Sequence, residues 1–448
     1  MPDIIEQIRA AGVVGMGGAG FPTHAKLKAG IRHIIINGVE CEPLLCADRY
    51  LMRHRADELI DALSILRRET GAEQATICLK SEYAEETAAL REAISRKHTD
   101  IGVHLTRSFY PAGDEQVVVY EVTGKIVPPM DIPLSVGCAV INVATLFAVS
   151  DALADRPLIS RCLTVDGEVK TPAIIEAPIG ASFAECIAAC GGTTRKDAVL
   201  VSGGPMMGRC YELDQAEELF TGKTTGGILV LPRDRYRSAS IDLHSLKTRA
   251  SVACIQCSYC TQMCPRYLLG HPLEPHRIMR KLAYGDLKDM LNDPVVQSAA
   301  LCSECGLCEV YACPMGLKPR SVNAWIKREM AAANIRFPKP AERVQVNAMR
   351  EMRLAPTLRV AVRAGVLAYE KAPLDRLIRL EPKKTVLALR QGIGASSVPL
   401  VSPGDRVRAG QRVAACPQGS LGADLHASID GFVQKVDPTI VIMREDSL

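Results

Sequence analysis

The sequence lacks any long uninterrupted apolar run and carries little net charge. Its 448 residues include 54 Lys and Arg against 50 Asp and Glu, a formal net charge of +4. No apolar stretch approaches the roughly 20 residues that a membrane-spanning helix needs, and the first residues do not have the architecture of a secretory signal. So small a basic excess predicts no nucleic-acid or membrane surface, and we expect a cytoplasmic protein.

We also expect no disulfide bonds, although the chain contains 17 cysteines. A reducing cytoplasm keeps thiols free, and eight of these cysteines gather in two short runs between residues 254 and 313. We expect most of the other nine to be small buried apolar side chains. These nine are Cys41, Cys46, Cys78, Cys138, Cys162, Cys186, Cys190, Cys210 and Cys416.

The two cysteine runs have the spacing of iron–sulfur ligands. They read Cys254-x2-Cys257-x2-Cys260-x3-Cys264-Pro265 and Cys302-x2-Cys305-x2-Cys308-x4-Cys313-Pro314. Three thiolates at two-residue gaps wrap three corners of a cubane, and in two-cluster ferredoxins the fourth cysteine binds the other cluster. One [4Fe–4S] cluster is therefore assigned to Cys254, Cys257, Cys260 and Cys313. The second [4Fe–4S] cluster is assigned to Cys302, Cys305, Cys308 and Cys264.

Zinc is the alternative for these cysteines, since paired CxxC motifs also form zinc ribbons. Two triple runs that each end in Cys-Pro fit zinc poorly, because zinc takes four ligands in two pairs. The second run has one more residue before its last cysteine than the first run. The geometry at Cys313 is therefore left open.

The first half of the chain predicts two modules. Strands and helices alternate over residues 1–155, which predicts an α/β domain with a mainly parallel sheet. Residues 47–71 are expected to form one long amphipathic helix. A hairpin, a short helix and a further strand over residues 156–235 predict a small β-grasp-like module.

The second half predicts a change of structural class. Residues 245–330 contain the cysteine runs in otherwise helical sequence. Residues 331–395 are polar and basic with proline breaks, and we expect a helical connector there. Short strands and glycine turns over residues 396–448 predict a small β-domain.

The string Gly15-Met16-Gly17-Gly18-Ala19-Gly20 matches the G-x-G-x-x-G fingerprint of dinucleotide-binding domains. That fingerprint must follow a strand and open a long helix. Here a helical segment precedes it, and Pro22 comes two residues after its last glycine. The context argues against a Rossmann site and leaves two alternatives, a different phosphate ligand or a glycine turn without a ligand.

Four motifs, in order, resemble the FMN site of the NADH-binding subunit of respiratory complex I and of the C subunit of Rnf electron-transport complexes. They are GMGGAGFPTHAKL, IINGVECEP, YPAGDEQ and INVATL. The resemblance covers residues 12–155 and continues through the β-grasp and double-cluster regions. It implies that the β-grasp module is of the SLBB type. It implies a complex-I-type FMN-binding α/β domain, with NADH as the electron donor over the flavin.

The resemblance also implies roles for single residues. Backbone N–H groups of four glycines would hold the FMN phosphate, namely Gly15, Gly17, Gly18 and Gly20. The side chain of Lys26 would add positive charge. The ribityl chain and flavin ring would be lined by Asn37, Glu40, Glu42, Gly113, Asp114 and Glu115. Polar groups on the phosphate or ribityl side would come from Asn142 and Thr145. Phe21 would stack on the nicotinamide dinucleotide, with a core position as its alternative.

The C-terminal β-domain resembles the barrel-sandwich hybrid of lipoyl and biotinyl domains. The tip that would carry a modified lysine reads Leu425-His426-Ala427-Ser428, so we expect neither lipoylation nor biotinylation. Rnf C subunits typically begin with an extra domain, whereas the glycine loop here begins at residue 12. The domain order instead resembles the cobalamin reductases of propanediol-utilisation microcompartments.

That resemblance implies electron transfer from NADH through FMN and two [4Fe–4S] clusters to cob(III)alamin. The implied partners are cobalamin or cobalamin-handling enzymes, such as an adenosyltransferase and a diol dehydratase, with microcompartment shell proteins around them. The expectation that the acceptor is a corrinoid rests on the resemblance alone, because the sequence contains no cobalamin-binding motif of the type D-x-H-x-x-G. An Rnf-like subunit of a membrane complex and a microcompartment redox protein with another acceptor are the alternatives. The oligomeric state is left open, as is the role of the first helix as an encapsulation peptide or a structural element.

Overall fold

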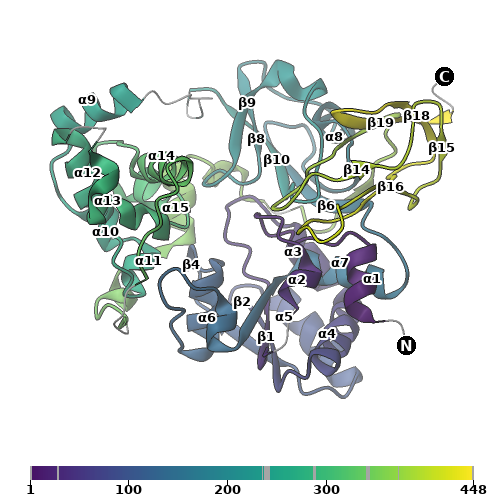
Figure 1. The fold of residues 1–448 in the computed structure, drawn as a ribbon, viewed down its shortest axis with the longest axis horizontal. Coiled ribbons are helices and arrows are strands. Elements are labelled where there is room, and N and C mark those ends of the chain that lie inside the picture. Colours follow the sequence, from purple (N-terminus) through teal and green to yellow (C-terminus); the bar gives the residue numbers. More distant parts are fainter. Residues whose placement is uncertain are drawn as a thin grey trace.

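The chain forms four modules. Figure 1 shows a parallel-sheet module that contains the N-terminus, a mixed sheet above it, a helical module to one side, and C-terminal strands packed on the first two. In this computed structural model the described residues are 3–27, 30–234, 236, 243–285, 289–339, 344–371 and 373–445.

A four-stranded parallel sheet forms the centre of the first module, in the order β3-β2-β1-β5. The strands are β1 (His33–Asn37), β2 (Gln74–Lys80), β3 (Gly102–Thr106) and β5 (Cys138–Asn142). Ile34 and Ile36 of β1 pack into one hydrophobic core, whereas Ile35 packs into another. The sheet is therefore buried on both faces, as parallel sheets are, and the expected α/β class is confirmed.

Helices cover both faces of this sheet. The Ile34 face is covered by α1 (Ile4–Ala10), α3 (Ala47–His54), α4 (Ala56–Thr70), α5 (Ala84–Arg96) and α7 (Val143–Leu153). The Ile35 face is covered by α6 (Glu115–Thr123). Ile8 of α1 is fully buried in the first of these cores, so the first helix is an integral part of the module.

The single helix expected over residues 47–71 is wrong, because α3 and α4 are separate helices. Arg55 leaves the helical region, with φ −130° and ψ 29°. Its guanidinium pairs with Glu58 and lies 4.6 Å from the centroid of the Phe147 ring. The break lets α3 pack on α5 and α7 while α4 continues along α7, which one straight helix would not do.

The second module is a six-stranded sheet in the order β12-β7-β6-β10-β8-β9. Its strands are β6 (Ser160–Gly167), β7 (Ala173–Pro178), β8 (Ala198–Ser202), β9 (Arg209–Glu212), β10 (Gly227–Pro232) and β12 (Leu377–Arg379). The sequence predicted the hairpin β6–β7 and the helix α8 (Phe183–Ala189), which begins with a Ser182–Glu185 capping box. The helix packs on the sheet, as in a β-grasp module.

The third module is helical and contains the cysteine runs. Its helices are α9 (Leu243–Ala253), α10 (Tyr259–Gln262), α11 (Pro265–Leu268), α12 (Pro275–Tyr284), α13 (Pro294–Gln297) and α14 (Pro319–Ala332). Between Cys308 and Cys313 the chain forms a turn of π-helix, η5 (Cys308–Ala312). A π-turn holds more residues than an α-turn, so it absorbs the extra residue of the second cysteine run.

The expected helical connector over residues 331–395 is only partly helical. It contains α15 (Thr357–Ala364), but also β11 (Ala355–Pro356), β12 and β13 (Lys384–Ala388). These strands pair with β4 (Phe109–Tyr110), with β7 and with β19 (Thr439–Met443), respectively. β12 and β13 add to the edges of larger sheets, whereas β11 and β4 form a separate two-stranded sheet. These short segments have no clear periodicity of their own.

The C-terminal β-domain consequently begins at Lys384 and not at residue 396. Its two sheets are β13-β19-β18-β15 and β14-β16-β17. The remaining strands are β14 (Val398–Pro399), β15 (Arg406–Val407), β16 (Arg412–Ala415), β17 (Leu425–His426) and β18 (Gly431–Lys435). The lysine-free tip is buried, and the Ser428 hydroxyl donates to the carbonyl oxygen of Ile179 in the second module (2.6 Å).

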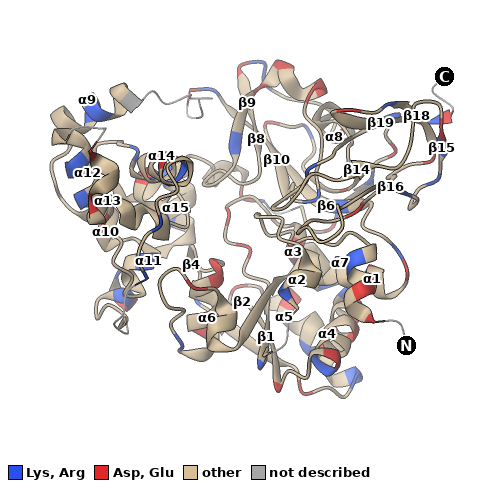
Figure 2. Cartoon of the chain, viewed as in Figure 1, with Lys and Arg blue, Asp and Glu red and all other residues tan. Residues whose placement is uncertain are grey.

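Short 3-10 turns complete the secondary structure at η1 (Pro133–Val136), η2 (Leu213–Glu217), η3 (Met290–Asn292), η4 (Ser298–Leu301), η6 (Arg350–Met352) and η7 (Leu367–Tyr369). Figure 2 shows acidic and basic residues interspersed over all four modules. Within the described ranges, each helix is too short or too polar to cross a bilayer.

Two buried cations join three of the modules. The Lys223 ammonium donates to the carbonyl oxygens of Gly12 and Asp424, each at 2.7 Å. The Arg161 guanidinium donates to the carbonyl oxygens of Met16 (3.0 Å) and Lys223 (2.7 Å). Residues 12–16 of the first module are thus held by the second module and the C-terminal β-domain together.

We predict that Lys223 makes stability depend on pH. Burial lowers its pKa from 10.5 to about 7, so between these values the unfolded chain binds more protons than the folded chain. The free energy of unfolding should rise with pH in that window, by up to about 1.4 kcal/mol per pH unit. Lys223→Met should remove this rise. The measurement is the thermal midpoint of the variant minus that of wild type, taken at pH 7 and again at pH 10. Lys196→Met, at an exposed lysine, is the control, and identical pH profiles for the two variants would contradict the prediction.

Candidate functional site

The glycine loop lies at the carboxyl edge of the parallel sheet, although it precedes β1 in the chain. The Met16 N–H donates to the hydroxyl of Thr145 (2.8 Å), which is in the first turn of α7. Asn142 caps α7 and pairs in register with Asn37, the last residue of β1. In open α/β sheets this edge is where ligands bind. The loop connects α1 to α2 (Thr23–Lys26), which agrees with the argument against a Rossmann unit.

The four glycines of the loop divide into two kinds. The Gly15 N–H donates to the carbonyl oxygen of Phe21 (2.7 Å), and the Gly20 N–H donates to that of Gly15 (3.2 Å). These two groups close the loop, which corrects their expected role as phosphate donors. Gly17 and Gly18 are exposed, and their N–H groups have no acceptor among the described residues. Of the four loop glycines, Gly17 and Gly18 are the two whose N–H groups remain free for a ligand within the described part of the chain.

Two carboxylates line the neighbouring wall of the site. The Glu42 Oε2 accepts from the Met206 N–H (2.9 Å), and burial raises the pKa of Glu42 to about 7. Burial, then the nearby Asp48 carboxylate, raises the pKa of Glu40. The Glu40 Oε2 is buried and has no hydrogen-bond partner in the described part of the chain. Asn37 donates to the carbonyl oxygen of Gly113 (2.9 Å), which fixes the opposite loop.

Other predicted residues have structural partners. Lys26 forms an ion pair with Glu115. Asp114 caps α6 and pairs with Arg266 at 2.9 Å. Phe21 is half-buried and belongs to none of the hydrophobic cores, so its core alternative gains no support.

The residues present fit a flavin mononucleotide. Exposed N–H groups at Gly17 and Gly18 suit a phosphate, and the N-terminus of α7 adds positive potential behind them. Gly18 has φ +139°, which L side chains rarely adopt. The buried Glu40 Oε2 has no partner among the described residues, and the nearby Asp48 carboxylate accepts from the Asn142 amide at the start of α7. A bound group of this kind would satisfy donors and acceptors that the chain leaves open.

The structure brings the eight clustered cysteines together in two groups. Burial raises the pKa of Cys260 to about 12, and the thiols that act on it most are those of Cys313, Cys257 and Cys254. Burial also raises the pKa of Cys308, where the nearby thiols are those of Cys302, Cys305 and Cys264. We call these the outer group (Cys254, Cys257, Cys260, Cys313) and the inner group (Cys264, Cys302, Cys305, Cys308). They are the two sets that the crossed spacing predicts.

The two groups differ in burial. In the inner group Cys264, Cys305 and Cys308 are buried, whereas all four outer thiols are half-buried. In the described ranges, no three His, Cys, Asp or Glu side chains are close enough to share one metal ion. A [4Fe–4S] cluster takes one thiolate at each iron, so it does not need three side chains close to a single ion.

Direct contacts join the flavin-site loops to the inner group. The Tyr110 hydroxyl donates to the carbonyl oxygen of Cys305 (2.5 Å) and lies 3.2 Å from Glu42 Oε1. Arg266, the partner of Asp114, is two residues after Cys264. Sequence reasoning missed Tyr110, Met206 and Arg266 as site residues. Tyr110 lies inside the quoted YPAGDEQ motif, which was the available signal for it.

The nine dispersed cysteines are mostly buried, as expected. Full burial applies to Cys46, Cys78, Cys138, Cys186 and Cys190. Burial also raises the pKa of Cys78 and Cys186 to about 12, which keeps these thiols protonated and unreactive.

Four family matches cover the modules in order. Residues 8–151 match the Nuo51 FMN-binding domain, and residues 163–209 match the SLBB domain. Residues 253–318 match a 4Fe-4S dicluster domain, and residues 371–447 match the RnfC barrel sandwich hybrid domain. The chain is therefore an FMN and iron–sulfur protein.

Known proteins resemble the chain over different lengths. Cobalamin reductase PduS of Citrobacter freundii is 40% identical over 98% of this chain and 96% of its own length. The C subunit of the Na(+)-translocating ferredoxin:NAD(+) oxidoreductase complex of Acetobacterium woodii is 32% identical over 59% of this chain and 58% of its own. The structure of the NAD+-reducing [NiFe]-hydrogenase in the H2-reduced state matches with TM-score 0.50 and 20% identity, over 74% of this chain and 62% of that one. The last match concerns the fold alone.

We predict that Gly18→Ala weakens FMN binding by about tenfold, because a left-handed φ strains an L residue by about 1–3 kcal/mol. Gly404→Ala is the matched control, since Gly404 also has a left-handed φ and open space, but lies in the C-terminal β-domain. Titration of flavin-depleted protein with FMN will give both dissociation constants. Equal constants for the two variants would contradict a phosphate site at Gly18.

We predict that crossed ligation is visible in electron paramagnetic resonance of the reduced protein. Cys313→Ser should disturb the same cluster signal as Cys257→Ser, and Cys264→Ser the same signal as Cys305→Ser. The reason is that each fourth cysteine belongs to the other run's cluster. If Cys313→Ser instead matches Cys305→Ser, the crossed assignment is wrong.

Proposed function

The chain belongs to the family of cobalamin reductase PduS of Citrobacter freundii, and we propose that it reduces cob(III)alamin with electrons from NADH. One NADH gives up a hydride, and two cob(III)alamin molecules each take one electron to give NAD+, a proton and two cob(II)alamin. Bound FMN and [4Fe–4S] clusters supply the conversion from two-electron to one-electron chemistry. The named activity of a relative that matches nearly the whole chain supports the acceptor.

The single observation that carries an electron-transfer function is the contact between the flavin site and the inner cysteine group. The Tyr110 hydroxyl donates a hydrogen bond to the backbone of Cys305 and lies beside Glu42. The Asp114–Arg266 ion pair also joins the first module to the helical module. Both members of that pair are about nine-tenths buried, with side-chain exposures of 8% and 11%. A buried ion pair and a buried hydroxyl fix the distance between two redox sites, which a transfer path requires.

We infer an order for the two clusters from burial. The inner group adjoins the flavin site and is shielded, so it receives electrons first. The outer group is half-buried and passes them to the acceptor. This order is part of the proposal and follows from the contacts of Tyr110 and Arg266.

NADH is the proposed donor. The half-buried Phe21 ring at the glycine loop is free of core packing and can stack on a nicotinamide or adenine ring. A related protein of a translocating complex is named for reaction with NAD(+), which supports this donor. Glu42, with a pKa near 7, can hold a proton beside the flavin ring at neutral pH.

We further propose a cytoplasmic location inside a bacterial microcompartment, with an adenosyltransferase and a diol dehydratase as the enzymes served. This setting is implied by the resemblance of the domain order to the cobalamin reductases of propanediol-utilisation microcompartments. The second candidate function is that of an electron-transfer component in an Rnf-like complex. It is favoured by the match of 59% of the chain to a component of a translocating complex.

The proposed function predicts that anaerobic protein reduces aquacobalamin on addition of NADH. Cys305→Ser should abolish this reduction but leave flavin bleaching by NADH intact, since the flavin site itself is unchanged. Cys210→Ser, at a dispersed cysteine of β9, is the control and should keep both steps. Absorbance of the corrinoid and of the flavin follows the two steps separately.

Two outcomes would contradict this scheme in different ways. If wild type reduces ferricyanide with NADH but does not reduce aquacobalamin, the assignment of cobalamin as the acceptor is wrong. That result would favour the Rnf-like function. If Cys305→Ser still reduces aquacobalamin at the wild-type rate, the path through the inner cluster is wrong.

A further inference from the structure

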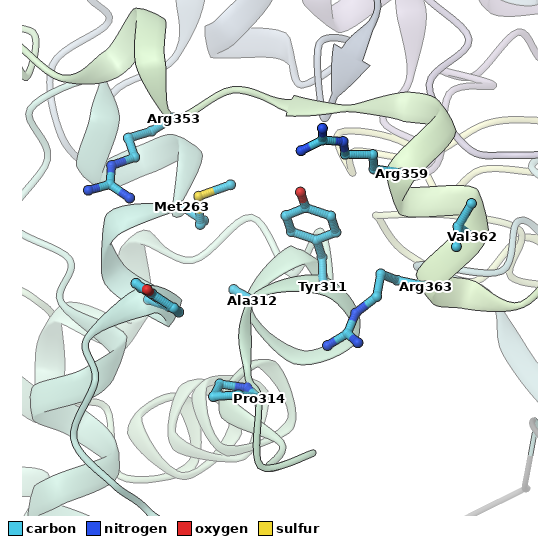
Figure 3. Close-up of a pocket in the computed structure, with 9 residues that line it drawn as sticks. Met263, Tyr311, Ala312, Pro314, Arg353, Arg359, Val362 and Arg363 are labelled. Carbon is cyan, nitrogen blue, oxygen red and sulfur yellow. The ribbon is translucent and has the colours of Figure 1, made fainter.

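A cavity of about 510 Å³ lies between the helical module and α15 (Figure 3). Its lining includes chain neighbours of three predicted cluster ligands. Tyr259 precedes Cys260, Met263 precedes Cys264, and Pro314 follows Cys313. Two of these three ligands belong to the outer group. The cavity thus touches the segments that hold the cluster from which electrons leave.

Three arginines give the cavity its charge. Arg353, Arg359 and Arg363 line it, and no carboxylate of the described residues lies within ion-pair distance of any of them. Arg359 and Arg363 are one helical turn apart on α15 and so share one face. Figure 3 shows both on the α15 side of Tyr311, with Arg353 across the cavity. Unpaired guanidinium groups around a cavity are suited to a phosphate, which they can bind bidentately.

The rest of the lining is apolar or aromatic. Tyr311 projects from the π-turn η5 into the cavity, and the Tyr259 ring is 48% exposed. Met263 and Val362 add aliphatic surface. Two rings and two aliphatic side chains suit a broad, partly apolar molecule, while the arginines require that it carry an anionic group.

We propose that this cavity binds the corrinoid electron acceptor, with Arg359 and Arg363 holding the phosphodiester of its nucleotide loop. The inference rests on the proposed function, in which the acceptor is a cobalamin. One electron passes from the outer cluster to Co(III), which becomes Co(II), and no bond to the protein forms or breaks. The part of the corrinoid outside the cavity lies over the exposed side chains of Met352 and Leu358, the chain neighbours of Arg353 and Arg359.

Equilibrium binding to the oxidised holoprotein tests the site without turnover. Ultrafiltration gives dissociation constants for aquacobalamin and for cobinamide, a corrinoid that lacks the phosphodiester. Wild type should bind aquacobalamin about tenfold more tightly than cobinamide, as expected for a charge-assisted pair of hydrogen bonds. The double variant Arg359→Gln/Arg363→Gln should lose that preference. Arg408→Gln, at an exposed arginine of the C-terminal β-domain, should keep it.

Kinetics gives a second readout. The double variant should raise the KM for aquacobalamin about tenfold, with unchanged iron content and an unchanged rate of NADH oxidation by ferricyanide. Wild-type affinity of the double variant for both corrinoids would overturn the assignment of the cavity. An equal loss of both corrinoids would overturn phosphate recognition.

The failure of the proposed function has a different signature. Wild type would then bind and reduce neither corrinoid while still oxidising NADH with ferricyanide, and the cavity assignment would fall with it. Inhibition of ferricyanide reduction by an added acidic electron-transfer protein would in that case identify the cavity as a protein docking surface.

Discussion

The glycine loop depends on two buried cations that bind backbone carbonyl oxygens. Lys223 holds Gly12, and Arg161 holds Met16, so each cation fixes the loop without using a carboxylate. The Arg161 guanidinium also places positive charge next to the loop, in which the Gly17 and Gly18 N–H groups have no acceptor among the described residues. In a Rossmann unit a helix that directly follows the loop supplies such potential. Here it comes from a neighbouring module and from α7.

Buried polar contacts also join the flavin site to the cysteine groups. The modules are joined by a few buried polar contacts in which each partner has a defined geometry. Tyr110 and the Asp114–Arg266 pair leave the inner cysteine group little freedom to move relative to the flavin site. Removing either member of the ion pair would leave an uncompensated buried charge, which is strongly destabilising. Separating the flavin site from the inner cysteine group would therefore cost a large free energy, which keeps the two sites close together.

Local patterns in the sequence predicted most of the architecture. Cysteine spacing predicted both thiol sets, and the order of four motifs predicted the flavin module, because each signal lies within a short segment. The missed features depend on partners far apart in the chain. Arg266 meets Asp114 across 152 residues. The strands β11 and β12 pair with β4 and β7, which lie far away in the sequence. The use of the Gly15 and Gly20 N–H groups inside the loop is likewise invisible in a G-x-G-x-x-G string. The π-turn at Cys308 explains an extra residue that spacing alone left unresolved.

The closure of the loop by the C-terminal β-domain has a consequence for biosynthesis. A Cβ on Gly20 would come within 2.6 Å of Gly392, and Asp424 shares Lys223 with Gly12. The loop is synthesised before these supports, because Gly392 and Asp424 follow it in the chain. Until those residues have been made, the nascent loop lacks the contacts that close it in the folded protein. A flavin site closed by these contacts therefore forms only after residue 424 has been synthesised.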